Sequence, residues 1–164
     1  MFVVDTNVLI HAVDADSPWH APCRAALERW RRQPSRWCLT WSILYEFLRN
    51  VTHRGGRNPV PFHRAWSVAE GLLSSPGLQV LVESPRHAEV VGELPADLSG
   101  NAIHDAHIVA LMREHGIRRI YTRDAGFRRY EDLEVIDPAT MPSSPGVAEP
   151  AGRYRARRRS RPRA

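Results

Sequence analysis

The chain opens with the stretch MFVVDTNVLI (residues 1–10), in which the apolar run Phe2-Val3-Val4 leads directly into Asp5. Such a run predicts a buried strand, and a carboxylate at its end stands where an apolar side chain is expected. Three more acids interrupt apolar stretches further along: Glu46, Asp105 and Asp124. Burying an ionised carboxylate without a compensating charge costs several kcal/mol, so all four together predict a bound cation.

Protein cations at matching positions are scarce, because Arg123 is the only basic residue immediately beside any of the four acids. Two carboxylates about 4 Å apart repel each other by roughly 4 kcal/mol at an effective dielectric of about 20, and a divalent ion turns that repulsion into attraction. Carboxylate oxygens are hard ligands that suit Mg²⁺ or Mn²⁺. The residue types therefore predict a hard-cation site.

Short apolar runs alternate with amphipathic stretches along the body of the chain. The predicted strands are residues 2–4, 37–40, 78–82, 119–122 and 133–136. The predicted helices are one opening at Ser17-Pro18, one from an N-cap at Ser42 to about residue 52, and others near 62–73, 86–94 and 101–115. This alternation predicts an α/β domain with a parallel sheet covered on both faces.

Ligands of such folds bind beyond the carboxyl ends of the strands. Asp5 and Asp124 each follow a predicted strand, while Glu46 and Asp105 each lie about one turn into a predicted helix. We therefore expect the four carboxylates to converge on one edge of the sheet.

The domain is predicted to span residues 1–138, followed by a disordered tail rich in Pro and Arg at residues 139–164. Seven of the 23 basic residues lie in the last twelve positions, so the rest of the chain carries 16 basic against 18 acidic residues, despite the overall charge of +5. An arginine-rich tail could hold RNA through phosphate contacts, or could be only a solvated extension.

Two separated cysteines, Cys23 and Cys38, lack the spacing of a metal site and are expected to be reduced thiols. We find neither a signal-peptide core nor an apolar stretch of about 18 residues. The expectation is a cytoplasmic protein that does not enter a membrane.

The four acids stand within motifs that resemble those of the PIN-domain nucleases, and most closely the VapC-type toxins of bacterial toxin–antitoxin pairs. These motifs are VDTNVLI at residues 4–10, YEFLR at 45–49, GNAIHDAH at 100–107, and TRD at 122–124 followed by Phe127. The resemblance covers residues 1 to about 138 and implies a three-layer α/β/α sandwich with a central parallel sheet of four to five strands. It also implies metal-dependent ribonuclease activity, a VapB-type antitoxin partner and a homodimer. One departure is Gly126, where relatives often carry a further acid.

For this chemistry we expect Asp5 and Asp105 to bind the ion directly, and Asp124 directly or through water. Glu46 would orient or deprotonate the attacking water, or bind a second ion. From the resemblance, Thr6, Asn7 and Thr122 would steady the carboxylates or a phosphate through hydrogen bonds.

Each acid also has a structural explanation. Asp5 could form a turn after its strand, Glu46 could face solvent, Asp105 could pair with His104 or His107, and Asp124 could cap a segment that starts at Ala125. For the four acids to have no common site, all four of these explanations would have to be true together.

Other classes of function are less consistent with the residues. A haloacid-dehalogenase-type phosphatase needs an acid two residues after the first aspartate, where this chain has Asn7. A zinc site at His104 and His107 lacks an evident third ligand. A non-catalytic PIN-fold module that binds nucleic acid or protein remains the alternative. We further expect Trp19, Trp30 and Trp66 to line a groove for an antitoxin segment.

Overall fold

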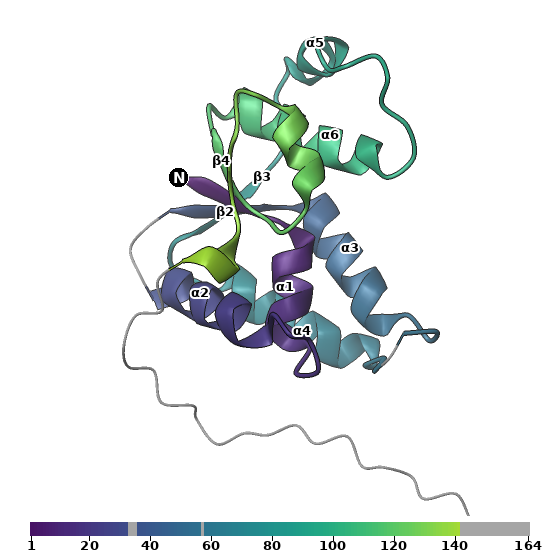
Figure 1. Cartoon of the computed structure of the whole chain (residues 1–164), viewed down its shortest axis with the longest axis vertical. Helices are drawn as coiled ribbons and strands as arrows, with labels where there is room; N and C mark the ends of the chain where they lie inside the picture. The colour runs from purple at the N-terminus through teal and green to yellow at the C-terminus, as the bar shows by residue number, and fades with distance from the viewer. Residues whose placement is uncertain (33–35, 57, 142–164) are drawn as a thin grey trace, which may run out of the picture.

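The computed structural model describes residues 1–32, 36–56 and 58–141, and its centre is one five-stranded parallel sheet (Figure 1). The strands are β1 (Phe2–Val4), β2 (Trp37–Thr40), β3 (Leu78–Leu81), β4 (Arg119–Tyr121) and β5 (Glu134–Ile136). Their order is β3-β2-β1-β4-β5, and every neighbouring pair is parallel. The predicted parallel α/β architecture is confirmed, with five strands.

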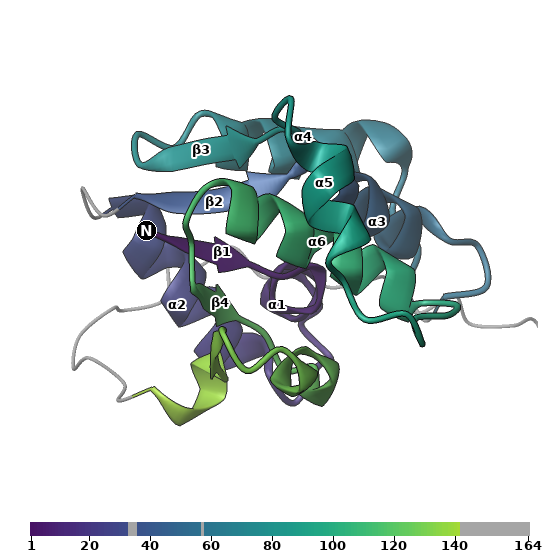
Figure 2. The same cartoon turned by 90° about the horizontal axis from the view of Figure 1, so that it is seen from above.

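Helices cover both faces of this sheet. They are α1 (Thr6–Val13), α2 (His20–Arg32), α3 (Trp41–Thr52), α4 (Phe62–Leu73), α5 (His87–Gly92) and α6 (Ala102–Glu114), with 3₁₀ turns η1 (Ala125–Arg129) and η2 (Pro138–Thr140). Figures 1 and 2 show α1 to α4 on one face, and α5 and α6 together on the other. This is the three-layer arrangement that the resemblance implied.

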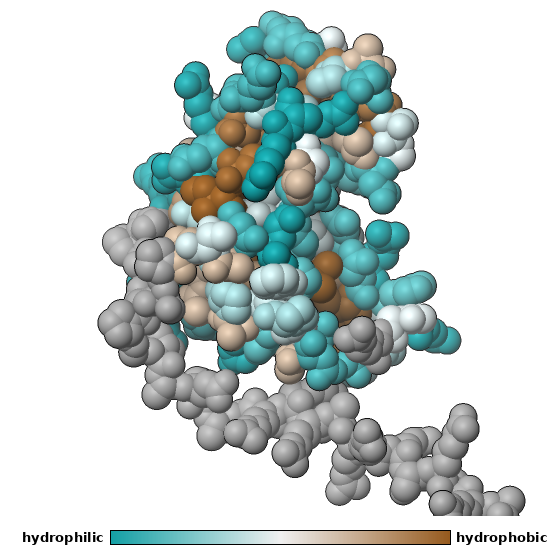
Figure 3. Space-filling view, viewed as in Figure 1, coloured by the Kyte–Doolittle hydropathy of each residue, from teal (hydrophilic) through white to brown (hydrophobic). Residues whose placement is uncertain are grey.

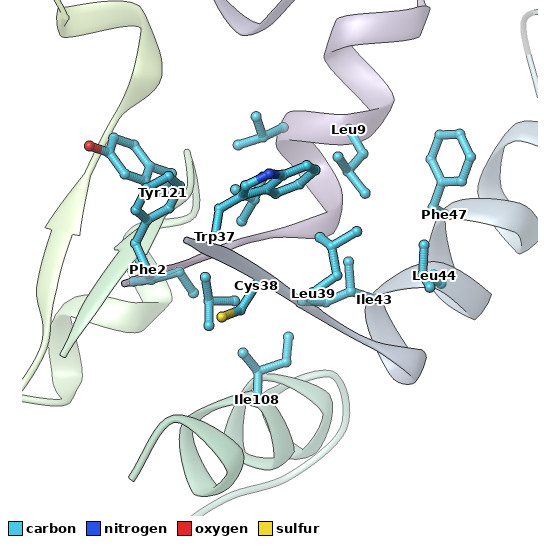
Figure 4. Close-up of a cluster of buried hydrophobic side chains, with 14 of the residues drawn as sticks. Phe2, Leu9, Trp37, Cys38, Leu39, Ile43, Leu44, Phe47, Ile108 and Tyr121 are labelled. Carbon is cyan, nitrogen blue, oxygen red and sulfur yellow. The ribbon is translucent and has the colours of Figure 1, made fainter. Parts of the chain in front are cut away.

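The core is built on the central strands, because parallel strands have both faces buried. All four residues of β2 are buried, and in Figure 4 Trp37 and Leu39 lie toward Leu9 of α1 while Cys38 lies toward Ile108 of α6. Apolar side chains from the two helical layers thus meet the sheet from opposite sides. The short apolar runs of the sequence are explained by this double burial.

Trp30 belongs to this core and not to a surface groove. It is only 3% exposed, and its ring centroid lies 5.3 Å from that of Phe2 and 4.6 Å from that of Tyr121. The predicted groove of Trp19, Trp30 and Trp66 is therefore wrong, because Trp30 is buried against aromatic residues of β1 and β4 and cannot line a surface groove.

Three local features differ from the sequence prediction. Helix α2 begins at His20, because residues 17–19 form a turn, and not at Ser17-Pro18. Residues Thr6–Val13 form the helix α1, where the sequence suggested only a turn after the first strand. Helix α3 is capped by Thr40, whose hydroxyl accepts a hydrogen bond from the Ile43 N–H at 3.1 Å, and not by Ser42. Strand β2 therefore runs directly into α3.

We expect Thr40→Ala to lower the free energy of unfolding by about 1 kcal/mol, because it leaves the first turn of α3 without its cap. Urea denaturation monitored by circular dichroism measures this difference. Thr40→Ser is the matched control, since it keeps the hydroxyl and should retain most of the stability. Equal losses in both variants would show that the methyl group, and not the cap, matters.

Ordered structure continues past residue 138 to Met141, because η2 packs on α2 and Pro138 is buried. The remainder of the predicted tail lies outside the described residues. Within the described residues, no helix combines the length and apolar character needed to span a membrane. The face seen in Figure 3 is largely hydrophilic, with apolar side chains gathered in a few patches.

Candidate active site with four acidic residues

Asp5 lies at the carboxyl end of β1, in the centre of the sheet. Its backbone N–H donates to the Tyr121 carbonyl of β4 at 3.0 Å, and its Oδ1 accepts the Thr6 N–H at 2.6 Å as the N-cap of α1. The residue is only 5% exposed. The strand-to-helix turn thus places a carboxylate in a buried position, which is unusual for an aspartate.

Two neutral side chains hold the other oxygen of Asp5. The Thr122 hydroxyl, which follows β4, donates to Asp5 Oδ2 at 2.6 Å, and Asn7 Nδ2 donates to the same oxygen. Asn7 also links the start of α1 to the segment after β4, because its Oδ1 accepts the Arg123 N–H at 3.1 Å. Thr122 and Asn7 therefore occupy the carboxylate-supporting positions that the sequence suggested for them.

Glu46, on α3, faces the start of α1. Its Oε2 accepts a hydrogen bond of 2.7 Å from the hydroxyl of Thr6, which is 3% exposed. Glu46 is half-buried, so the reading of a purely solvent-facing glutamate is wrong. Thr6 thus contacts the carboxylates of both Asp5 and Glu46, although Glu46 lies 40 residues further along the chain.

Asp124 and Asp105 approach the site from the β4 side and from α6. Asp124 Oδ1 accepts the Gly126 N–H at 2.7 Å, and its backbone N–H donates to the Thr122 hydroxyl at 2.9 Å. A Cβ atom at Gly126 would lie 3.0 Å from Asp124 Oδ1 and 3.7 Å from Asp105 Oδ2. Position 126 therefore faces both carboxylates, and an acid there would extend the acidic cluster of Asp5, Glu46, Asp105 and Asp124.

The electrostatics show that these carboxylates act on one another. Burial, followed by repulsion from Asp105 and Glu46, raises the pKa of Asp5 to about 7, although hydrogen bonds from Thr122 and Thr6 oppose the rise. Burial, then repulsion from Asp124 and Glu46, raises the pKa of Asp105 to about 6. A neighbouring cation would reverse both shifts, because it favours the charged forms.

Arg123 does not supply that cation through its side chain. Its Nε lies 3.2 Å from both carboxylate oxygens of Asp137, and its guanidinium carbon lies 3.3 Å from the ring centroid of Trp19. The side chain is thereby directed to Asp137 and Trp19. Arg123 is therefore engaged with Asp137 and Trp19, although it is adjacent to Asp124 in sequence.

The four acids lie close enough for their charges to interact, but their oxygens are not all within 4.8 Å of one another. In the described part of the chain, the only three potential ligands whose atoms all lie within 4.8 Å of one another are Glu83, His87 and His107. His107 bonds to Ser42 and Glu83, and not to Asp105. Asp5 and Asp124 do cap helical segments, so the structural explanation holds for those two residues, but each also lies in the acidic cluster.

The sequence search missed Glu83 and His87. Glu83 does follow the predicted strand at residues 78–82, but no motif marks it, and His87 lies 20 residues before His107, so no spacing signal connects the three residues. The packing of α5 on α6 brings His87 close to His107.

Comparison with known families gives a match to the PIN domain over residues 2–133. The chain is 34% identical to the Mycobacterium tuberculosis protein named Ribonuclease VapC48, over 139 residues that cover 82% of this chain and 94% of that protein. It is also 35% identical to Ribonuclease VapC43 of the same organism, over 141 residues that cover 84% and 95% of the two chains.

Solved structures with the same fold come from the same group of proteins. The M. tuberculosis protein VapC20, described as a sarcin–ricin loop cleaving toxin, matches with a TM-score of 0.60 at 23% identity, covering 79% of this chain and 94% of that one. VapBC2 from Rickettsia felis, bound to a promoter DNA fragment, matches with a TM-score of 0.60 at 18% identity, covering 83% and 98%.

Proposed function

This chain belongs to the PIN-domain family, among the VapC-type toxin ribonucleases, and from that premise we propose that its acidic cluster hydrolyses RNA with a divalent metal ion. The observation that carries the proposal is the buried Asp5, held at the junction of β1 and β4 and acted on by the charges of Asp105 and Glu46. A protein gains nothing in stability from such mutually repelling acids, whereas a nuclease needs them.

The donor set suits Mg²⁺ or Mn²⁺, because all four side chains offer hard carboxylate oxygens. Burial and mutual repulsion raise the pKa values of Asp5 and Asp105, and a bound cation would lower both. In this proposal Asp5, Asp105 and Asp124 hold the ion. When bound, the ion would supply a water of lowered pKa and offset the negative charge that builds on the phosphoryl and leaving oxygens.

Other residues of the chain would then position the reactants. Glu46, oriented by Thr6, orients the attacking water or accepts its proton. Thr122 and Asn7 keep Asp5 in place through their hydrogen bonds. A small cavity of about 50 Å³ is lined by Asp124, Arg128 and the ion pair of Arg123 with Asp137, among others. Arg128 would hold a phosphate of the RNA backbone there, next to Asp124.

A cleavage assay tests the proposal against the non-catalytic alternative. RNA labelled along its length is incubated with the protein and Mg²⁺ or Mn²⁺, with and without EDTA. We expect internal cleavage that requires the metal and stops in EDTA. Intact RNA under all conditions would favour a binding module, and release of terminal phosphate alone would favour a phosphatase.

The proposal extends to partners. We propose a VapB-type antitoxin and a homodimer, supported by the family and by toxin–antitoxin complexes among its fold relatives, and an action in the cytoplasm, where RNA is abundant. Light scattering of the purified chain measures the oligomeric state. Growth arrest on expression, relieved by a co-expressed antitoxin, tests the regulation.

We expect Thr6→Val to lower the cleavage rate by about 10- to 100-fold, because removing the hydroxyl frees Glu46 from its orienting bond. Single-turnover cleavage measures the loss. Thr6→Ser, which keeps the donor, is the control and should stay within a few-fold of the wild type. If valine and serine behave alike, the Thr6–Glu46 bond has no part in the reaction.

A further inference from the structure

A second group of potential metal ligands lies outside the acidic cluster. One ligand atom from each of Glu83, His87 and His107 falls within 4.8 Å of the other two. The three residues come from the segment after β3, from the first residue of α5 and from the middle of α6. Three separate elements of the fold therefore present side chains to one point.

The Nδ1 atom of each imidazole has a hydrogen-bond partner outside the three residues, and the Nε2 of His107 faces Glu83. The Nδ1 of His87 is bonded to Oε1 of Glu114, and the Nδ1 of His107 lies 3.2 Å from the hydroxyl oxygen of Ser42. If each Nδ1 carries the proton, each Nε2 keeps a lone pair for a metal ion. Histidines that bind metals in proteins usually donate their other N–H to a carboxylate, carbonyl or hydroxyl partner in this way.

The partner of His87 is itself firmly placed. The Glu114 side chain is 0% exposed, and its second oxygen accepts the Ser84 N–H at 2.6 Å. This buried carboxylate can therefore orient the imidazole and raise the basicity of its free nitrogen. The Ser42 hydroxyl is likewise anchored, by a 2.7 Å contact with the Thr40 hydroxyl.

The third residue can adapt to an ion. Glu83 Oε1 lies 3.0 Å from Nε2 of His107, and the Glu83 side chain is 53% exposed. Tetrahedral ligands at about 2.0–2.1 Å from Zn²⁺ lie roughly 3.3 Å apart, so this oxygen and nitrogen already have nearly the required separation. An exposed glutamate can complete the approach by changing its rotamer.

We propose that Glu83, His87 and His107 form a second metal site that binds Zn²⁺ or a similar divalent transition-metal ion, and that the bound ion ties α5 and the segment after β3 to α6. Two imidazoles and one carboxylate favour such ions over Mg²⁺, which prefers oxygen ligands. The site is separate from the acidic cluster in its residues and in its preferred ion, and it stands whether or not that cluster cleaves RNA.

The test uses the full chain without a histidine tag, stripped with chelator, and carrying Asp5→Asn and Asp105→Asn so that the acidic cluster does not compete. We expect calorimetry to show one Zn²⁺ bound per chain, and Co²⁺ to give the intense visible absorption of a four- or five-coordinate site. Zn²⁺ should also raise the melting temperature, because it binds only the folded chain.

Variants in the same background identify the ligands. His87→Ala and Glu83→Gln should abolish Zn²⁺ binding, and the exposed Glu83 makes the second change safe for folding. Glu114→Gln should weaken binding about 10- to 100-fold, as expected of a residue that orients a ligand. His104→Ala is the matched control, since this exposed histidine of α6 lies outside the group and should bind as the parent does.

Two results would overturn the proposal. One is absence of Zn²⁺ binding by the parent. The other is Zn²⁺ binding that survives both His87→Ala and Glu83→Gln, or that is lost with His104→Ala, because the ion would then be held elsewhere. In either case these side chains form only a hydrogen-bonded cluster.

Discussion

Asp5→Asn is expected to lower the rate of RNA cleavage by on the order of 10³-fold or more. The substitution removes one of the carboxylates proposed to hold the metal ion, and loss of an interaction worth about 4 kcal/mol in the transition state corresponds to that factor. The substitution is nearly isosteric, and the amide oxygen can still accept the Thr6 N–H that caps α1. The amide NH₂ cannot accept from Thr122 and Asn7 as Asp5 Oδ2 does, so a thermal melt of the variant separates a loss of chemistry from a loss of folding.

Single-turnover cleavage of labelled RNA in Mn²⁺ measures this effect. Asp16→Asn is the matched control, because it makes the same chemical change at an exposed aspartate outside the acidic cluster and should cleave at the wild-type rate. Identical purification of both variants also controls for contaminating ribonuclease. Wild-type activity in Asp5→Asn would remove Asp5 from the proposed site.

Without metal, the stability of the wild type should fall as pH rises from about 4 to about 7. The folded-state pKa of Asp5 is raised from 3.8 to about 7, so the folded chain binds this proton more tightly than the unfolded chain does. The stabilisation from that proton is complete below the unfolded pKa and is lost as pH rises through the folded pKa. A shift of this size corresponds to on the order of 4 kcal/mol at this 5% exposed group.

Urea denaturation in EDTA across this pH range measures the loss. Asp5→Asn isolates the contribution of Asp5, because the variant should lose that part of the pH dependence and keep the smaller part from Asp105, whose pKa is also raised. Adding Mn²⁺ at pH 8 should restore stability to the wild type and do little for Asp5→Asn, since the ion compensates the ionised carboxylates. A wild type that is as stable at pH 8 as at pH 5 in EDTA would contradict the raised pKa.

Much of the fold could be predicted because buried parallel strands leave a strong local signal. The runs at residues 2–4 and 37–40 match β1 and β2, and the other three predicted strands differ from the observed ones by a single residue at one end. β1 and β2 are buried at every position, so they stand out without knowledge of their neighbours, and the other three strands are marked by shorter apolar runs. The helices with a clear apolar stripe, such as α4, were equally evident.

Features that depend on distant partners could not be predicted. The segment Thr6–Val13 is short and contains β-branched residues, so its own sequence is a weak helix signal, and its contacts with α2 and α3 stabilise it as α1. The sequence predicts Ser42 as the cap of α3, because serine is a common cap. In the fold, Ser42 instead lies beside His107, and Thr40 takes the cap.

The four acids proposed to form the active site can be picked out from the sequence, because acids within or after apolar runs are costly to bury. Their hydrogen-bond partners depend on the fold. The bonds from Thr122 to Asp5 and from Thr6 to Glu46 join residues 117 and 40 positions apart, and the meeting of His87 with His107 depends on α5 packing against α6. Such contacts arise when whole helices and strands pack together. They produce no periodic pattern in the sequence, so they cannot be predicted from it.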